Sequence, residues 1–421
     1  MSCIQIIGGI PLSGEIEVQG CKNAVLPLMA ASVLHRGITV IHRCPRIRDV
    51  VSMSRILEEL GVKVTFEDHS IKIDAREITN TAISDTYATR LRASVVLMGS
   101  VAGRMGRIRL PYPGGCVIGK RPVDYHIKVM ETLGAEVAIS EEEMCVSVNE
   151  TLWKRDNIHI RLPFPSVGAT QTAILACVLR PGKTWIYGCA REPEIEEVCR
   201  FLIQKGARIY RAGKGELCIE GVKGLKDSQY ELMSDRIVAG TYLFAAMATR
   251  GCITVKKVNP EHLTAVLDKL WELGARMWIG KEEIFIDARR TRFIEGSLKT
   301  DVYPGFPTDL QSPFVALICT KKGNYKIEET VFEHRFQILT PLKKMGAQLE
   351  EDHGCLWVRG TGELQGTEVE ACELRGGAAL VIAGLAARGK TIVKPAGYIK
   401  RGYEDICGDL KALGADIMEI E

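Results

Sequence analysis

The sequence contains one pattern that recurs six times. A helix-like segment that ends in glycine and leads into a β-like segment is found along the whole chain, with its glycines at Gly61, Gly134, Gly206, Gly274, Gly346 and Gly414, 68 to 73 residues apart. A second series, in which an apolar run ends in glycine, falls at Gly37, Gly106, Gly182, Gly251, Gly323 and Gly389, 66 to 76 residues apart. Two markers that share one period predict six copies of one supersecondary unit.

Each copy is predicted to contain two helices and a small sheet. The first helix is apolar nearly all round, as in AVLPLMAASVL and ATQTAILACVL, so it must be buried on every side. The second is amphipathic, and Gly61 supplies the left-handed residue that ends the first example of it. The apolar positions of that helix, at helical spacing, are Val50, Met53, Ile56, Leu57 and Leu60. A strand follows the first helix and a β-hairpin follows the second. Buried helices with sheets outside them predict an inside-out α/β barrel.

The two ends of the chain are predicted to belong to the same domain. The sixth copy stops at LKALGADIMEIE, and the N-terminal segment CIQIIGGIPLSGEIEVQG has the strand pattern that this copy lacks. We therefore expect two pseudo-symmetric α/β domains of three copies each, one over 22–233 and one formed by 1–21 plus 234–421. They would be joined by a double hinge near residues 21 and 233. A cleft on such a hinge is a natural place for a site that must exclude water.

Composition excludes several classes of protein. The 421 residues include 55 Lys and Arg, 52 Asp and Glu, and 6% aromatic residues, so we expect no nucleic-acid partner. The longest apolar stretch, AALVIAGLAA, is half of what a bilayer requires, and the N-terminus has no basic region before an apolar block. We expect a soluble protein with no membrane partner and no export signal. Its 14 cysteines include no CxxC, which favours free thiols in a reducing cytoplasm.

One loop departs from the repeat. The segment LPYPGGCVIGKRPVDYH is longer than its counterparts and places Cys116 near Lys120 and Arg121. Neighbouring cations favour the thiolate, which is the reactive form of cysteine. Cys116 is therefore a candidate reactive thiol. The alternative is an incidental cysteine in a surface loop.

The turns that enter the apolar helices concentrate polar residues. Helix N-termini bind anions through their free N–H groups and the helix dipole, so several cations on equivalent turns predict a polyanionic ligand. An N-cap role alone is the alternative for Ser166 and Asp309, and a solvated surface position is the alternative for Arg335 and Arg401. The residues on the turns are Lys22, Asn23, Arg92, Ser166, Arg236, Asp309 and Arg375.

Ten motifs together resemble one family. In order along the chain they are GCKNA, LRAS, PGGCVIGKRPVDYH, PSVGAT, AREPEI, DRIVAGT, FPTD, TVFEHRF, LRGGA and RGYEDI. The order and the residues resemble those of the UDP-N-acetylglucosamine 1-carboxyvinyltransferases, whose fold is two inside-out α/β domains. The resemblance implies transfer of the enolpyruvyl group of phosphoenolpyruvate to the 3′-hydroxyl of UDP-N-acetylglucosamine. Phosphate is released in this step of peptidoglycan synthesis, and the resemblance implies no metal or organic cofactor.

The resemblance also implies roles for individual residues. The reaction needs an acid that protonates C3 of the enol and a base that takes the hydroxyl proton. By their motifs, Cys116 is the acid and the site of a covalent adduct, Asp309 is the base, and Lys22 and Arg401 complete the catalytic set. The implied phosphoenolpyruvate contacts are Lys22, Asn23, Arg121, Arg335, Arg375 and Arg401. The implied contacts to the UDP-sugar are Asn23, Arg92, Arg121, Pro122, Val123, Asp124, Tyr125, Phe164, Pro165, Ser166, Val167, Asp309 and Val331.

Three positions depart from the family pattern. Phe164 stands where some members carry a lysine, His334 where asparagine is common, and Val238 where glutamate is often found. We expect these changes to alter substrate affinity more than mechanism. Two alternatives remain. One is the related transferase that uses shikimate 3-phosphate, whose Gly-Asn-Ala-Gly-Thr loop is absent here, and the other is a non-catalytic UDP-sugar-binding paralogue.

Overall fold

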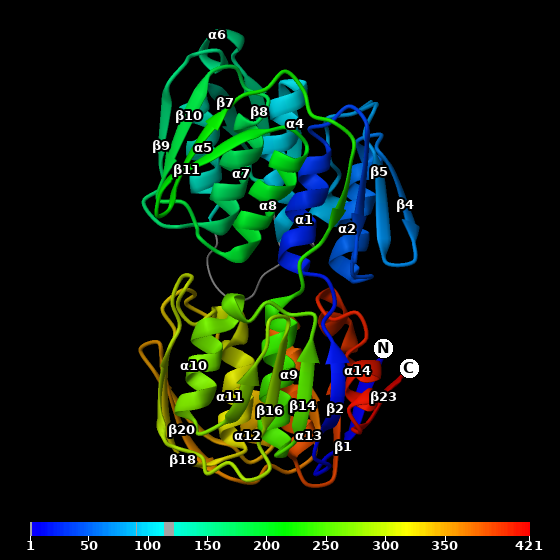
Figure 1. Cartoon of the computed structure of the whole chain (residues 1–421), viewed down its shortest axis with the longest axis vertical. Coiled ribbons are helices and arrows are strands. Elements are labelled where there is room, and N and C mark those ends of the chain that lie inside the picture. Colours follow the sequence, from blue (N-terminus) through cyan, green and yellow to red (C-terminus); the bar gives the residue numbers. More distant parts are fainter. Residues whose placement is uncertain (1, 90, 113–121) are drawn as a thin grey trace. The chain divides into compact units, whose positions relative to one another are not determined.

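The computed structural model describes residues 2–89, 91–112 and 122–421. Cys116, Lys120 and Arg121 lie outside these ranges. The described chain divides into two compact units (Figure 1). The C-terminal unit contains the N-terminal segment as far as Gln19 together with Ser234–Glu421, and the N-terminal unit contains the described residues between Gly20 and Met233.

The N-terminal unit has three sheets. The first contains, in order, β13 (Ser228–Glu231), β3 (Ile38–His42), β5 (Ser70–Asp74) and β4 (Lys63–Glu67). The second contains β6 (Arg107–Pro111), β8 (Glu143–Val148) and β7 (Ala135–Ile139). The third contains β11 (Arg208–Gly213), β12 (Glu216–Glu220), β10 (Lys183–Tyr187) and β9 (Ile158–Arg161).

The C-terminal unit also has three sheets. The first contains β15 (Arg276–Ile279), β16 (Glu283–Asp287), β14 (Cys252–Lys256) and β2 (Ser13–Glu17). The second contains β17 (Gly296–Lys299), β18 (Lys322–Glu328), β20 (Cys355–Thr361) and β19 (Gln348–Asp352). The third contains β21 (Glu368–Glu370), β22 (Lys390–Lys394), β1 (Cys3–Ile7) and β23 (Asp416–Ile420).

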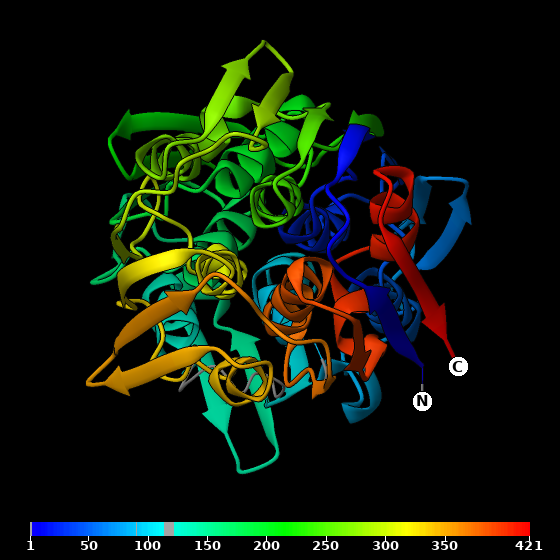
Figure 2. The ribbon, with the colours of Figure 1, turned by 90° about the horizontal axis from the view of Figure 1, so that it is seen from below.

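Five of the six sheets share one arrangement. In these five, the last sheet included, the strand that follows an apolar helix pairs with a parallel strand on one side and an antiparallel strand on the other. For example, β14 pairs with β2 and with β16 in this way. In the last sheet β1 takes the antiparallel place beside β22 and also pairs with β23. Figure 2 shows this dark-blue strand beside the red C-terminal strand. The N-terminal segment therefore supplies the strand that the sixth copy lacks.

The helices alternate between two kinds. The apolar ones are α1 (Lys22–Ser32), α4 (Leu97–Met105) with the 3₁₀ turn η1 (Arg92–Val96) before it, α7 (Val167–Cys177), α9 (Arg236–Thr249), α11 (Gln311–Cys319) and α13 (Leu374–Ala386). The amphipathic ones are α2 (Arg48–Glu59), α5 (Asp124–Leu133), α8 (Pro193–Gln204), α10 (Thr264–Glu272), α12 (Leu339–Lys344) and α14 (Ile406–Ala412). Short elements complete the chain: α3 (Asp85–Ala88), α6 (Glu150–Trp153), η2 (Pro260–Leu263), η3 (Thr308–Leu310) and η4 (Ala396–Arg401).

The apolar helices form the core of each unit, as their composition predicts. Every residue of α9 and of α11 is buried. In the C-terminal unit α9, α11 and α13 all pack against one another (Figure 1). In the N-terminal unit α4 packs against both α1 and α7. The apolar face predicted for α2 is confirmed, because the side chains at its five apolar positions are fully buried.

Backbone conformation explains most of the glycines in the two series, since Gly106, Gly182, Gly323 and Gly389 of the second series also have positive φ. All six glycines after the amphipathic helices have positive φ, from 88° at Gly274 to 102° at Gly206, which confirms the left-handed end predicted for Gly61. In the second series Gly251 has no positive φ. A Cβ there would lie 2.4 Å from the carbonyl oxygen of Leu12, so close approach of the backbone requires glycine at this position.

Among the residues that the structure describes, no helix is both long and apolar enough to span a bilayer.

We predict that Ile6→Ala destabilises the C-terminal unit by about 2 to 5 kcal/mol, because it leaves a cavity in a packed core. Ile6 is fully buried on β1, and its Cδ1 approaches α13 at Gly384. Hydrogen exchange of peptides from β22 and β23 measures the change. Gln5→Ala, which alters the half-buried neighbour on the same strand, is the control. Equal protection of these peptides in both variants would contradict a core role for β1.

Candidate active site

Most of the predicted site residues lie where the apolar helices begin. Lys22 is the first residue of α1, Arg92 the first of η1 and Arg375 the second of α13. Asp309 lies in η3, directly before α11, and Ser166 is the N-cap of α7. These residues come from both units. Because the helices are buried along their length, their first turns are where polar side chains can gather.

Asp309 is held by two arginines of its own unit. Its Oδ1 lies 2.8 Å from Nη2 of Arg335, and its Oδ2 lies 3.0 Å from Nη2 and 3.3 Å from Nε of Arg375. The side chains of Arg335 and Arg375 are 2% and 3% exposed, whereas that of Asp309 is 29% exposed. Asp309 is not at an N-cap position, since Pro307 and Leu310 occupy those positions. The structure brings together three of the predicted site residues in one ion-pair cluster, the Asp309 cluster.

Arg375 also lies over an aromatic ring. Its guanidinium carbon lies 5.9 Å from the centre of the Tyr403 ring, and the Tyr403 hydroxyl is 2.7 Å from Oγ1 of Thr241. Burial acts to lower the pKa of Arg375, but Asp309, with Tyr403 and Asp235, outweighs it and raises that pKa above its ordinary value. Arg375 is therefore a permanent cation. The bond to Thr241 fixes the Tyr403 ring, and the two bonds to Asp309 orient the guanidinium.

Glu329 organises the neighbouring loop and was not predicted from the sequence. One carboxylate oxygen accepts hydrogen bonds from the backbone N–H groups of Val331 and Phe332, at 2.9 and 3.1 Å. The other accepts from Oγ1 of Thr308, at 3.0 Å. Glu329 thus connects Val331, a predicted UDP-sugar contact, to the turn that carries Asp309. A glutamate two residues before a site residue was the only signal in the sequence.

Lys22 is paired with a residue that the sequence analysis did not identify. Its Nζ lies 2.8 Å from Oδ2 of Asp49, and the two side chains are 10% and 6% exposed. Asp49 lies in the first turn of α2, and α2 packs against α1. A negative carboxylate is favoured at a helix N-terminus by the helix dipole. The amphipathic pattern of α2 does not reveal this role, because Asp49 precedes its apolar face.

The predicted UDP-sugar contacts of the N-terminal unit lie at the starts of four helices, α1, η1, α5 and α7. Arg92 Nη2 donates to the carbonyl oxygen of Pro122, at 3.2 Å, which connects η1 to the turn before α5. Ser166 caps α7, with its Oγ accepting from the N–H of Ala169 at 3.3 Å. The predicted alternative role of Ser166 as a cap is therefore observed. Asn23 is half-buried on α1, Asp124 is exposed, and Val123 is fully buried.

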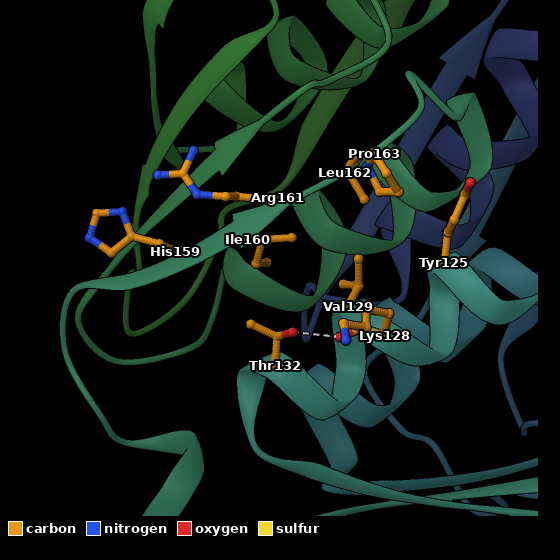
Figure 3. A pocket seen from close by; sticks show the side chains of 9 residues that line it. All are labelled: Tyr125, Lys128, Val129, Thr132, His159, Ile160, Arg161, Leu162 and Pro163. Carbon is orange, nitrogen blue, oxygen red and sulfur yellow. Dashed lines mark hydrogen bonds between the residues drawn. The ribbon is translucent and has the colours of Figure 1, made fainter.

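A pocket of about 210 Å³ adjoins these segments in the same unit (Figure 3). It is lined from α5 by Tyr125, Lys128, Val129 and Thr132, and from β9 and the two residues after it by the segment from His159 to Pro163. Thr132 Oγ1 donates to the carbonyl oxygen of Lys128, at 2.7 Å. Of the predicted site residues that the structure describes, only Tyr125 lines this pocket. The other residues that line the pocket were not predicted to contact a substrate.

The remaining predicted positions are distributed as follows. Arg401 is the half-buried last residue of η4. Phe164 is 41% exposed, and His334 is exposed beside the buried Arg335. Val238 is fully buried in α9, and its N–H donates to Oδ1 of Asp235 at 3.1 Å. Cys116 and Arg121 lie outside the described residues.

The described cysteines are free, and several are unreactive by their surroundings. Burial raises the pKa of Cys177 and of Cys319 to about 12, so these thiols stay protonated near neutral pH. Cys372 is exposed. It therefore provides a natural comparison for any experiment on a reactive thiol.

We predict that Arg375→Met lowers the free energy of unfolding by about 1.5 to 3 kcal/mol, because Asp309 keeps Arg335 but loses its charge-assisted hydrogen bonds to Arg375. Thermal or urea unfolding measures the change. The control is Arg289→Met, which breaks the exposed pair with Asp287 and should change stability too little to measure. If the two variants unfold alike, the Asp309 cluster does not stabilise the unit.

Comparison with known proteins identifies relatives over the full chain. The family model described as EPSP synthase (3-phosphoshikimate 1-carboxyvinyltransferase) matches residues 6–410. UDP-N-acetylglucosamine 1-carboxyvinyltransferase 2 of Caldanaerobacter subterraneus subsp. tengcongensis is 43% identical over 100% of both chains. UDP-N-acetylglucosamine 1-carboxyvinyltransferase 1 of Legionella pneumophila is 42% identical over 99% of this chain and 82% of its own.

Solved structures have the same fold. The enolpyruvyl transferase NikO from Streptomyces tendae superposes with a TM-score of 0.88 at 23% identity, over 100% of this chain and 99% of its own. EPSP synthase from Acinetobacter baumannii superposes with a TM-score of 0.73 at 17% identity, over 100% of both chains. The mixed α/β fold is therefore that of enolpyruvyl transferases. By its full-length relatives, the chain belongs to the EPSP synthase family, among its UDP-N-acetylglucosamine 1-carboxyvinyltransferases.

Proposed function

We propose that this protein transfers the enolpyruvyl group of phosphoenolpyruvate to the 3′-hydroxyl of UDP-N-acetylglucosamine and releases phosphate. The observation that carries the proposal is the full-length similarity to carboxyvinyltransferases named for this sugar nucleotide. The cations at the helix starts support it, since both substrates are anionic. The reaction commits the sugar nucleotide to peptidoglycan synthesis, and we place it in the cytoplasm.

In the proposed chemistry the sugar hydroxyl adds to C2 of phosphoenolpyruvate while C3 gains a proton, and C3 then loses a proton as phosphate leaves. Asp309 takes the proton of the attacking hydroxyl, and its 29% exposed carboxylate is oriented by Arg335 and Arg375. Cys116 protonates C3 of the enol, and its thiolate can instead add to C2 of the protonated phosphoenolpyruvate to form the covalent adduct. Lys22, Arg121 and Arg401 stabilise the charge of the phosphate and carboxylate of phosphoenolpyruvate, which fixed donors do without reorganisation.

We also propose the finer architecture and the remaining contacts. Each unit is an inside-out α/β barrel around its apolar helices, and the units act as two domains on a double hinge near residues 21 and 233. The mutual packing of α9, α11 and α13 supports the barrel. The segments around Tyr125 and Ser166 contact the UDP-sugar from the N-terminal unit, and the Val331 loop does so from the C-terminal unit.

The function is tested by measuring phosphate release from phosphoenolpyruvate with each acceptor in turn. UDP-N-acetylglucosamine should support turnover and shikimate 3-phosphate should not. Turnover with shikimate 3-phosphate alone would favour the related transferase. Binding of UDP-N-acetylglucosamine without phosphate release would indicate a non-catalytic paralogue.

Asp309→Asn should reduce kcat by 10²- to 10⁴-fold, because general-base assistance is typically worth that much. Steady-state phosphate release measures the change. The variant also loses two ion pairs, so turnover must be normalised to the folded fraction seen by circular dichroism. Asp287→Asn, in an exposed pair, is the control. Turnover above about a tenth of wild type would exclude Asp309 as the base.

A small epoxide phosphonate that mimics phosphoenolpyruvate should alkylate Cys116 selectively, since thiolate reactivity requires exposure and neighbouring positive charge. Peptide mapping by mass spectrometry locates the label, and UDP-N-acetylglucosamine should accelerate labelling. Buried Cys177 and Cys319 should remain unlabelled, and exposed Cys372 is the comparison thiol. Cys116→Ser should resist the reagent and lose most turnover, whereas Cys116→Asp offers another acid. Label found mainly on another cysteine would overturn the assignment.

A further inference from the structure

We propose that Asp49 is a positioning residue that holds the ammonium group of Lys22 ready for the anionic donor. This inference rests on the proposed function, in which Lys22 contacts the phosphate of phosphoenolpyruvate. It assigns to Asp49 a role in donor binding that acts through Lys22 rather than through contact with the substrate.

The first argument is the geometry of the pair. Lys22 begins α1 and Asp49 lies in the first turn of α2, so the pair joins the N-terminal ends of two packed helices. The 2.8 Å separation of Nζ and Oδ2 is that of a charge-assisted hydrogen bond. A lysine side chain has four rotatable bonds, and a fixed carboxylate restricts it to the conformation that reaches Asp49. The ammonium group is thereby held beside the first turn of α2, and the N–H groups of a helix start favour anions.

The second argument comes from the other buried lysines. Lys205 donates to the hydroxyl groups of Thr39 and Ser228, and Lys321 donates to the carbonyl oxygen of Ala248. Desolvation lowers the pKa of Lys205 to about 8 and that of Lys321 to about 7. Burial beside neutral acceptors thus lowers the pKa of both lysines. A carboxylate in contact favours the charged form instead, and Lys22 has this contact with Asp49.

The third argument is energetic. Desolvating both members of a buried ion pair costs so much that apolar replacements are often as stable. Stability alone therefore does not explain why Lys22 and Asp49 form an ion pair. In the proposed function, this end of α1 binds an anionic substrate. An ammonium group has three N–H donors. Pairing with one oxygen of Asp49 still lets the group donate to a phosphate oxygen, so orientation and donor binding are compatible.

The test compares Asp49→Asn with Asp49→Glu in the full-length enzyme. Asn keeps the size and removes the charge, so the KM for phosphoenolpyruvate should rise at least tenfold while the KM for UDP-N-acetylglucosamine stays within twofold. Glu restores the charge on a longer side chain and should recover part of the loss. Asp74→Asn is the matched control, because it breaks an ion pair in the same unit with Arg76, which is 64% exposed. Its two KM values should match those of wild type.

A second readout needs no turnover. Brief labelling with acetic anhydride near pH 8 modifies only neutral amines, and peptide mapping gives the rate at Lys22. Lys22 should be acetylated several-fold faster in Asp49→Asn than in wild type or Asp49→Glu. Circular dichroism checks that each variant is folded. Unchanged Lys22 labelling and an unchanged donor KM in an active Asp49→Asn enzyme would overturn the inference. Equal rises in both KM values would also overturn it, by indicating general disruption. Absence of transfer by wild type would instead overturn the proposed function.

Discussion

The burial of six apolar helices is the constraint on which the rest of the structure depends. Along α9 and α11 every residue is buried, so these helices can present polar groups to solvent mainly at their ends. A chain built from such helices concentrates its chemistry in the turns that enter them. Lys22, Arg92 and Arg375 all lie in first turns, where unpaired backbone N–H groups and the helix dipole favour anionic ligands. The same repeat that makes the core thus also makes the proposed anion sites.

Positive charge at these turns is controlled by carboxylates in both units. Asp309 connects Arg335 to Arg375, and Asp49 holds Lys22. Each carboxylate offsets the cost of burying a cation and fixes its direction before a substrate arrives. Preorganised charge of this kind stabilises a transition state more than mobile surface charge does, because no group must reorient when charge develops in the reaction. The two units therefore use one electrostatic arrangement at different helix starts.

The repeat and the helix boundaries could be predicted from sequence because they depend on local patterns. Gly61 ends a helix by its own backbone conformation, and the apolar spacing around Val50 and Met53 reports the face that is buried. The ion pairs depend on which helices pack together. Nothing in the spacing of Lys22 and Asp49, on separate helices, reveals that α1 packs on α2. The sequence likewise left open whether Asp309 is a helix cap, which the structure excludes because other residues hold the N-cap positions.

The three departures from the family motifs show which positions this electrostatic arrangement leaves free to vary. His334 is exposed although the next residue, Arg335, is buried against Asp309, so a change there leaves the ion pair intact. Val238 is buried among apolar side chains, and its contact with Asp235 uses only the backbone N–H, which any residue except proline supplies. Phe164 is exposed and precedes the Ser166 cap. None of the three is a member of a buried charged pair, whereas replacing one member of such a pair leaves its partner uncompensated. Among the site residues discussed, substitution is therefore expected to lower the stability most at Lys22, Asp49 and the Asp309 cluster.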